Sequence, residues 1–129
     1  MRRRRGIAAA AALLVVAADL VHETLTPTPF LHVRPTGVFV LAVLIAVALL
    51  AVAPSVPSLG VALGAGIAAG GALGTAVSGF AWNGVPDPLV GGGIAFNLSD
   101  LAIGVGDAVL IASVLVHAWT HRSRLREPL

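Results

Sequence analysis

The sequence predicts an all-α, polytopic membrane protein with four transmembrane helices and both termini in the cytoplasm. Hydrophobic residues make up 57% of its 129 residues and charged residues only 11%, which is far from the balance of soluble domains. No ionisable side chain lies between Gly37 and Pro86. Because a soluble domain of this size needs a charged surface, we expect one membrane domain over residues 1–129, with the lipid bilayer as its main partner.

The arginines predict the orientation of this domain. Seven of the eight lie near the two chain ends, four of them in Arg2–Arg5 and three in Arg122–Arg126. Arginines that flank membrane segments favour the cytoplasmic side, so both ends are expected there. We interpret the high isoelectric point as this topology signal and expect no nucleic-acid partner. The chain has no cysteine, which excludes disulfides and thiolate metal sites, and we expect no cofactor.

Four apolar runs predict the membrane spans, at about residues 7–26, 37–53, 59–80 and 98–119. The first ends at Thr26–Pro29, because proline cannot continue a helix. Pro54–Ser58 is expected to be a tight turn, and residues 81–95 an external loop rich in Trp, Asn, Pro and Gly. A secretory signal peptide is the alternative for the first run. It is disfavoured because the run continues past Ala18.

The third predicted span is rich in small residues, which permit close helix packing in lipid. Gly60 and Gly64 form a GxxxG pair, and Gly66, Gly70 and Gly74 continue the pattern. This motif is found at helix dimer interfaces. In a helix with so many glycines we favour packing within the chain over dimerisation. The oligomeric state is left open.

Carboxylates within the predicted spans indicate where a site would lie. Asp19 and Glu23 fall near the end of the first span, and Asp100 and Asp107 in the first half of the fourth. A helix rises about 1.5 Å per residue, so Asp107 lies about 10 Å deeper than Asp100 on roughly the same face. All four therefore fall in the outer half of the membrane. A charged side chain costs about 2.5–3.5 kcal/mol at the bilayer centre, so such residues are functional candidates by default.

Each of these carboxylates also has a structural interpretation. Asp100 suits the positive N-terminal end of the fourth helix, as part of a cap. Asp19 is one turn from His22 and could pair with it, and Glu23 could lie at the interface. Asp107 could accept a hydrogen bond from a Ser or Thr of a neighbouring helix. The spacing of His, Asp and Glu predicts no metal site.

Three blocks of sequence together resemble a known family. The most specific is Phe96–Gly106 (FNLSDLAIGVG), which fits the pattern F-N-x-[AS]-D-x-x-I-x-x-G. Gly70–Gly79 (GGALGTAVSG) is similar to G-G-x-x-G-N-x-x-D-R, and Asp19–Glu23 (DLVHE) follows D-x-x-T-K only at Asp19. These are the blocks of the lipoprotein signal peptidases (signal peptidase II), membrane aspartyl endopeptidases with four helices. The resemblance agrees with the number and order of the predicted spans.

The resemblance implies a place and a chemistry. Enzymes of this family remove signal peptides from bacterial prolipoproteins at the outer face of the cytoplasmic (inner) membrane, so prolipoprotein signal peptides are the implied partners. An ionised carboxylate takes a proton from water, while a second, protonated one donates to the scissile carbonyl. Asp100 occupies one position of this dyad. Residues expected to line the site are Asp19, Glu23, Thr75, Asn97 and Asp107.

The departures from the family predict a degenerate and inactive relative. Ser78 stands where the other catalytic Asp is expected, and a hydroxyl has a pKa far too high to replace it. Glu23 stands in place of the family's Lys, and Thr75 in place of its Asn. Asp107 is too far from Asp100 to share a water with it. Asp19 or Glu23, from the neighbouring helix, are the candidates for a substitute carboxylate.

The alternative from another class is a small membrane scaffold or transporter-like subunit. It would use Asp19, Asp100 and Asp107 for protons, cations or a partner helix, as intramembrane carboxylates do in many pathways. A complete pathway should continue into the inner half of the membrane. Between Asp107 and His117 the sequence offers only Ser113 as a polar side chain, which disfavours transport.

Overall fold

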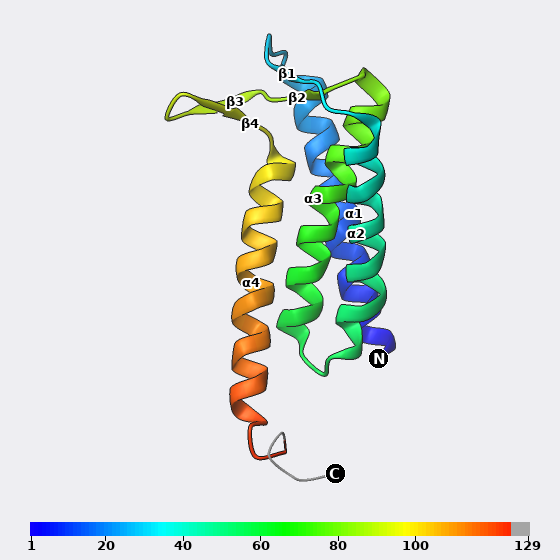
Figure 1. The fold of residues 1–129 in the computed structure, drawn as a ribbon, viewed down its shortest axis with the longest axis vertical. Coiled ribbons are helices and arrows are strands. Elements are labelled where there is room, and N and C mark those ends of the chain that lie inside the picture. Colours follow the sequence, from blue (N-terminus) through cyan, green and yellow to red (C-terminus); the bar gives the residue numbers. More distant parts are fainter. Residues whose placement is uncertain (125–129) are drawn as a thin grey trace.

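Four long helices run side by side in the computed structural model, which describes residues 1–124 (Figure 1). They are α1 (Arg2–Leu25), α2 (Thr36–Val52), α3 (Leu59–Trp82) and α4 (Leu98–Thr120). All four are long and apolar enough to cross a membrane, as the sequence predicts. The start of α1 and the end of α4 lie at one end of the bundle (Figure 1). Residues 26–35 and 83–97 lie at the other, here termed the loop end, and the expected basic residue Arg126 falls outside the described residues.

Helix α3 is the centre of the bundle and packs against each of the other three. Two thirds of its apolar window is buried (67%), against 6–22% in the other helices. Its glycines make this possible. A Cβ on Gly64 would stand 2.5 Å from the backbone nitrogen of Leu110 in α4, and one on Gly66 would stand 2.5 Å from the carbonyl oxygen of Ala8 in α1. The predicted packing of these glycines within the chain is confirmed.

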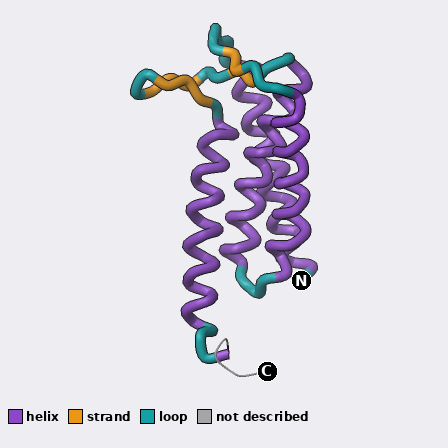
Figure 2. Tube along the Cα trace, in the orientation of Figure 1, coloured by secondary structure: helices purple, strands orange, loops and turns teal. Residues whose placement is uncertain are grey.

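Short strands at the loop end depart from the all-α prediction. β1 (Leu31–His32) pairs with β2 (Val85–Pro86), and β3 (Leu89–Gly91) pairs with β4 (Ile94–Phe96), both antiparallel. Figure 2 shows the β3–β4 hairpin extending sideways above α4. Its turn has positive φ angles at Gly92 (59°) and Gly93 (78°), as tight hairpins require. The loop expected over residues 81–95 is therefore wrong in part, because strands of two or three residues are too short to give an alternating pattern.

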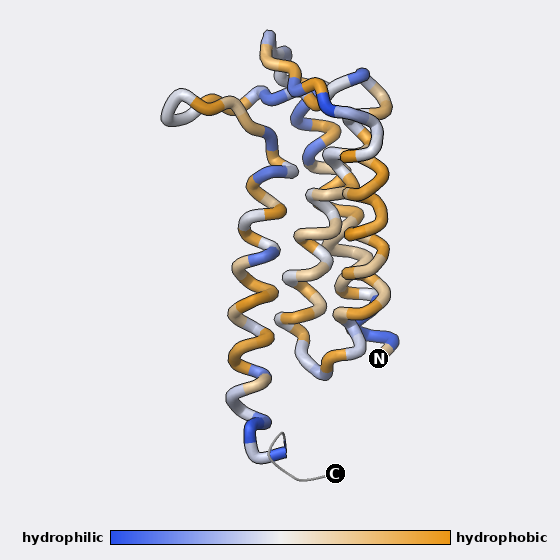
Figure 3. Tube along the Cα trace, viewed as in Figure 1, coloured by the Kyte–Doolittle hydropathy of each residue, from blue (hydrophilic) through white to orange (hydrophobic). Residues whose placement is uncertain are grey.

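The helix ends differ slightly from the predicted spans. α1 begins at Arg2 rather than near residue 7, since arginine is a good helix former. The Arg4 side chain donates to the carbonyl of Pro54 in the 3₁₀ turn η1 (Ala53–Ser55) at 2.9 Å. α3 continues to Trp82 and ends at Asn83 in the left-handed conformation (φ 54°), a common helix ending. Hydrophilic segments gather at the two ends of the bundle (Figure 3), as expected for a protein in lipid.

A Gly64→Ala substitution is expected to destabilise the bundle by about 1–3 kcal/mol, the usual range for overpacking. The added methyl group would meet the backbone of α4, which cannot move without separating the helices. Thermal unfolding in detergent would measure the effect. Gly104→Ala is the matched control, because a Cβ there meets nothing within 4 Å. Equal unfolding midpoints for the two variants would contradict the packing role of Gly64.

Candidate functional site

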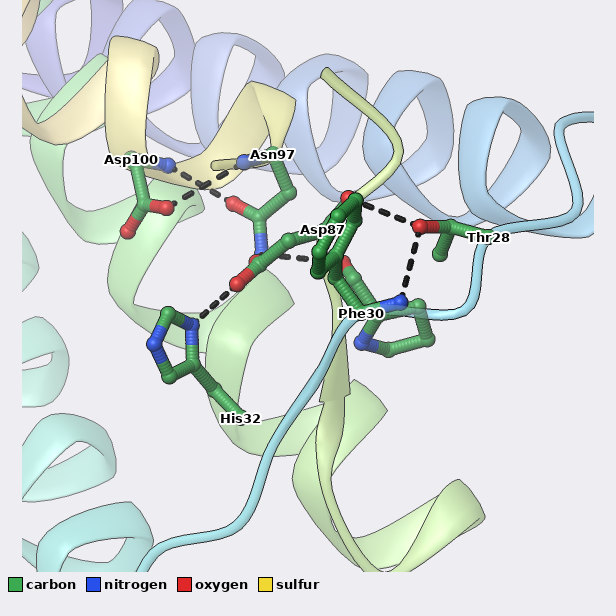
Figure 4. Close-up of polar contacts among 7 residues, drawn as sticks. Thr28, Phe30, His32, Asp87, Asn97 and Asp100 are labelled. Atoms are coloured by element: carbon green, nitrogen blue, oxygen red, sulfur yellow. Dashed lines mark hydrogen bonds and ion pairs between the residues drawn. The ribbon is translucent and has the colours of Figure 1, made fainter. Parts of the chain in front are cut away.

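The first turn of α4 is closed by a capping box. The Asn97 side chain accepts a hydrogen bond from the backbone N–H of Asp100 at 2.9 Å. The Asp100 carboxylate accepts one from the backbone N–H of Asn97 at 3.2 Å (Figure 4). The structural role predicted for Asp100 is thus confirmed. The box also fixes the direction of this exposed side chain at the loop end.

Asp87 lies in the external loop expected over residues 81–95, yet it is 1% exposed. Its carboxylate lies between Asn97, whose Nδ2 donates at 3.3 Å, and the ring of His32, which contacts it through Nδ1 (Figure 4). Its backbone N–H donates to Phe30 and its carbonyl accepts from the Thr28 hydroxyl, both at 3.0 Å. Asp87 therefore holds together the connection after α1, the segment before the hairpin and the start of α4.

Asp87 and Asp100 line one small cavity at the loop end. Its other lining residues include His32, Arg34 and Thr75. It has about 10 Å³ for the centre of a water molecule, which is close to the room that one ordered water needs. Asp87, which was not among the expected site residues, therefore shares this small cavity with Asp100. Its signal in the sequence was only an acidic residue between two prolines.

The two carboxylates of α1 have other partners. Asp19 is fully buried and accepts hydrogen bonds from the backbone N–H and the hydroxyl of Ser99, at 3.0 and 2.5 Å. Glu23 is 6% exposed and accepts one from the Ser78 hydroxyl at 2.5 Å. Glu23 is thus enclosed by protein near the end of α1, and Asp19 bonds to Ser99 rather than to His22. Within residues 1–124 neither carboxylate is hydrogen-bonded to Asp100.

Ser78 and Glu23 are two positions where the chain departs from the signal peptidase blocks, and they contact each other. Ser78 is fully buried and directed towards α1. Of the residues expected beside it, Thr75 lines the cavity of Asp100. The Oε1 atom of Glu23 and the hydroxyl of Thr75 are buried without a hydrogen-bond partner among the described residues. The sequence placed Glu23 and Ser78 in separate blocks and gave no sign of their contact.

A groove of about 320 Å³ leads from this cavity along the bundle between α2 and α4, with α3 at its floor. Asp100, Arg34 and Thr75 line it together with Asp107 and apolar residues of α2 and α3. Figure 1 shows α3 lying between α4 and the α1–α2 pair. Asp107 is exposed and has no hydrogen bond or ion pair with the part of the chain that is described. The hydrogen bond expected from a neighbouring Ser or Thr is therefore absent there.

Comparison with known proteins identifies a solved structure with the same fold. No protein-family model and no curated protein matches the sequence. A solved structure described as a bacterial membrane enzyme superposes with a TM-score of 0.68, over 96% of this chain and 94% of that one, at 18% identity. The chain shares the fold of that enzyme. In residues 1–124 no group of three or more His, Asp or Glu side chains is arranged to hold a metal ion.

Burial raises the pKa of the Asp87 carboxyl, and nearby Asp100 adds to this effect, while His32 and Arg34 oppose it. The folded protein thus binds this proton more tightly than the unfolded chain, where an Asp has a pKa of about 3.9. The stability that Asp87 contributes is full below that pH and falls as pH rises through the raised value.

Asp87→Asn should therefore reduce the loss of thermal stability as the pH rises above about 4, since an amide does not titrate. Unfolding midpoints in detergent would measure this. Because His32 contacts the Asp87 carboxylate, the comparison is repeated in a His32→Gln background. An unchanged pH dependence after Asp87→Asn in both backgrounds would contradict the prediction.

Proposed function

We propose that this protein is a signal peptidase II-like protein of the bacterial inner membrane that binds the signal helices of prolipoproteins without cleaving them. The Phe96–Gly106 block supports the family, and the four-helix fold is consistent with it. The groove between α2 and α4 suits an apolar helix, and Asp100 stands at its loop end. With the arginine-rich helix ends in the cytoplasm, this end lies at the outer face of the membrane.

The observation that carries the proposal is the hydrogen bond from Ser78 to Glu23 at 2.5 Å. Ser78 stands at the position of the family's second catalytic carboxylate, and its hydroxyl faces α1. Asp100 thus keeps its place on the groove but lacks the partner that the family's mechanism needs. A site of this kind can hold a signal helix and leave its peptide bond intact.

A second candidate, a peptidase with a rebuilt pair, is favoured by the cavity that Asp87 shares with Asp100. In this candidate, Asp87 would be the proton donor because it is buried, and Asp100 would be the base because it is exposed. Such a difference in environment separates the roles of two carboxyls. The contacts of Asp87 with His32 and Asn97 support a structural role instead. We therefore rank this candidate second.

The transporter-like alternative has less support. Asp19 is enclosed by its contacts with Ser99, whereas Asp107 lies on the groove. A proton or cation pathway needs such groups to line one continuous route. Among the described residues, the cavities that contain Asp100 or Asp107 do not include Asp19.

Purified protein in nanodiscs should bind a lipid-modified prolipoprotein and leave it uncut, while an active signal peptidase II cuts the same sample. Fluorescence anisotropy measures binding and gel electrophoresis measures cleavage. The mature lipoprotein, which has no signal helix, is the control ligand and should not bind. Absence of binding would refute the proposal. Cleavage that is lost in both Asp100→Asn and Asp87→Asn would favour the second candidate.

A double-mutant cycle tests the contact between α1 and α3. Ser78→Asp alone should be destabilised by several kcal/mol, because it buries a second carboxylate beside Glu23. In the double variant, Glu23→Lys should reduce this loss of stability, because the new Lys can pair with the new carboxylate at position 78. The coupling should exceed about 1 kcal/mol in unfolding experiments, and the double variant is the one in which cleavage should appear. Additive effects of the two substitutions would contradict the contact.

A further inference from the structure

Asp107 is a carboxylate inside a membrane span, and no described residue forms a hydrogen bond or ion pair with it. It lies nine positions after the first residue of α4, so about 14 Å from the loop end of that helix. Its side chain is exposed and lines the groove. Charged residues at such depth are rare in membrane proteins, and they pair with other groups or mark functional pathways.

Among residues 1–124, no counter-charge is paired with Asp107. The groove residues of α3 and α4 include the apolar Ala68, Ala72 and Ile103. Arg34 lines the mouth of the groove and precedes α2. The closest basic candidate on α4 is His117, ten positions further on and about 15 Å away. A partner for Asp107 must therefore come from whatever occupies the groove.

The shape of the groove indicates an elongated occupant. Its wall on α2 runs from Val38 to Leu49, eleven helical steps or about 16 Å. This wall is apolar, and the side facing it is half apolar, through Ala68, Ala72 and Ile103. A second helix laid along this wall would have its own side chains at the depth of Asp107. A lipid acyl chain would fill the same space but has no hydrogen-bond donor there.

We propose that the groove binds a membrane helix with a Lys or Arg about 14 Å from the loop end, whose cation pairs with Asp107. This inference rests on the proposed function, in which an apolar helix occupies the groove. It adds the ion pair by which the groove would select among such helices. An ordinary signal peptide has its basic residues at the cytoplasmic end, before an apolar core. Asp107 would thus favour a subset of helices with a basic residue inside the core.

The test uses synthetic Leu/Ala helices in nanodiscs that differ at one position. One peptide has Lys at the depth of Asp107, a second has Leu there, and a third has the Lys seven residues deeper. The first should bind the wild-type protein at least 10-fold more tightly than the other two. The preference should vanish in Asp107→Asn. It should persist in Gly104→Ala, a control on the same helix where the added Cβ meets nothing within 4 Å and which does not line the groove.

Reversing the charge at position 107 tests whether the peptide preference depends on that charge. Asp107→Lys should prefer a peptide with Glu at the same position over the Lys peptide. Equal binding of the Lys and Leu peptides to the wild-type protein would overturn the pairing. If prolipoprotein still binds in that case, the proposed function stands and only this inference fails. Retention of lipid that depends on Asp107, without any peptide preference, would also overturn it in favour of a lipid occupant.

Discussion

The start of α4 is the constraint on which the site depends. The first backbone N–H groups of a helix have no partner within it, and inside a membrane protein each must be satisfied by the protein itself. Asn97 and Asp100 satisfy two of these groups through the capping box, and Asp19 of α1 accepts the N–H of Ser99. Negative charge is also favoured at this end of a helix. The same side chains that begin the helix thus set the position of Asp100.

The groove follows from the way α4 is attached. Only 6% of its apolar window is buried, although it packs along α3. Close approach of the two backbones at Gly64 and Gly106 holds it against α3, so the side facing α2 is left open. The α3 residues at the floor of the groove, Ala68, Ala72 and Thr75, are all small. A bundle with large residues on α3 would have no such surface.

The features that could be predicted from the sequence are those that depend on local composition. Hydropathy located the four spans, and the spacing of the glycines predicted how α3 packs. Asp87 was missed because its burial depends on pairing with a segment 55 residues earlier, through His32. The contact between Glu23 and Ser78 joins positions that are also 55 residues apart. Neither has a periodic or local pattern, so only the folded chain brings these residues together.

The contact between Glu23 and Ser78 also explains why two departures from the signal peptidase pattern occur together. A Lys at position 23 beside Ser78 would be a buried charge without a partner, which is strongly destabilising. Under the proposed function, a chain with Ser at position 78 gains stability when position 23 holds a residue that accepts a hydrogen bond from this hydroxyl. The Phe96–Gly106 block needs no such change, because Asp100 and Asn97 are required for the helix cap whatever the chemistry. Under the proposed function, a relative without cleavage would still need this block for the helix cap, so the block supports the fold and the groove rather than catalysis.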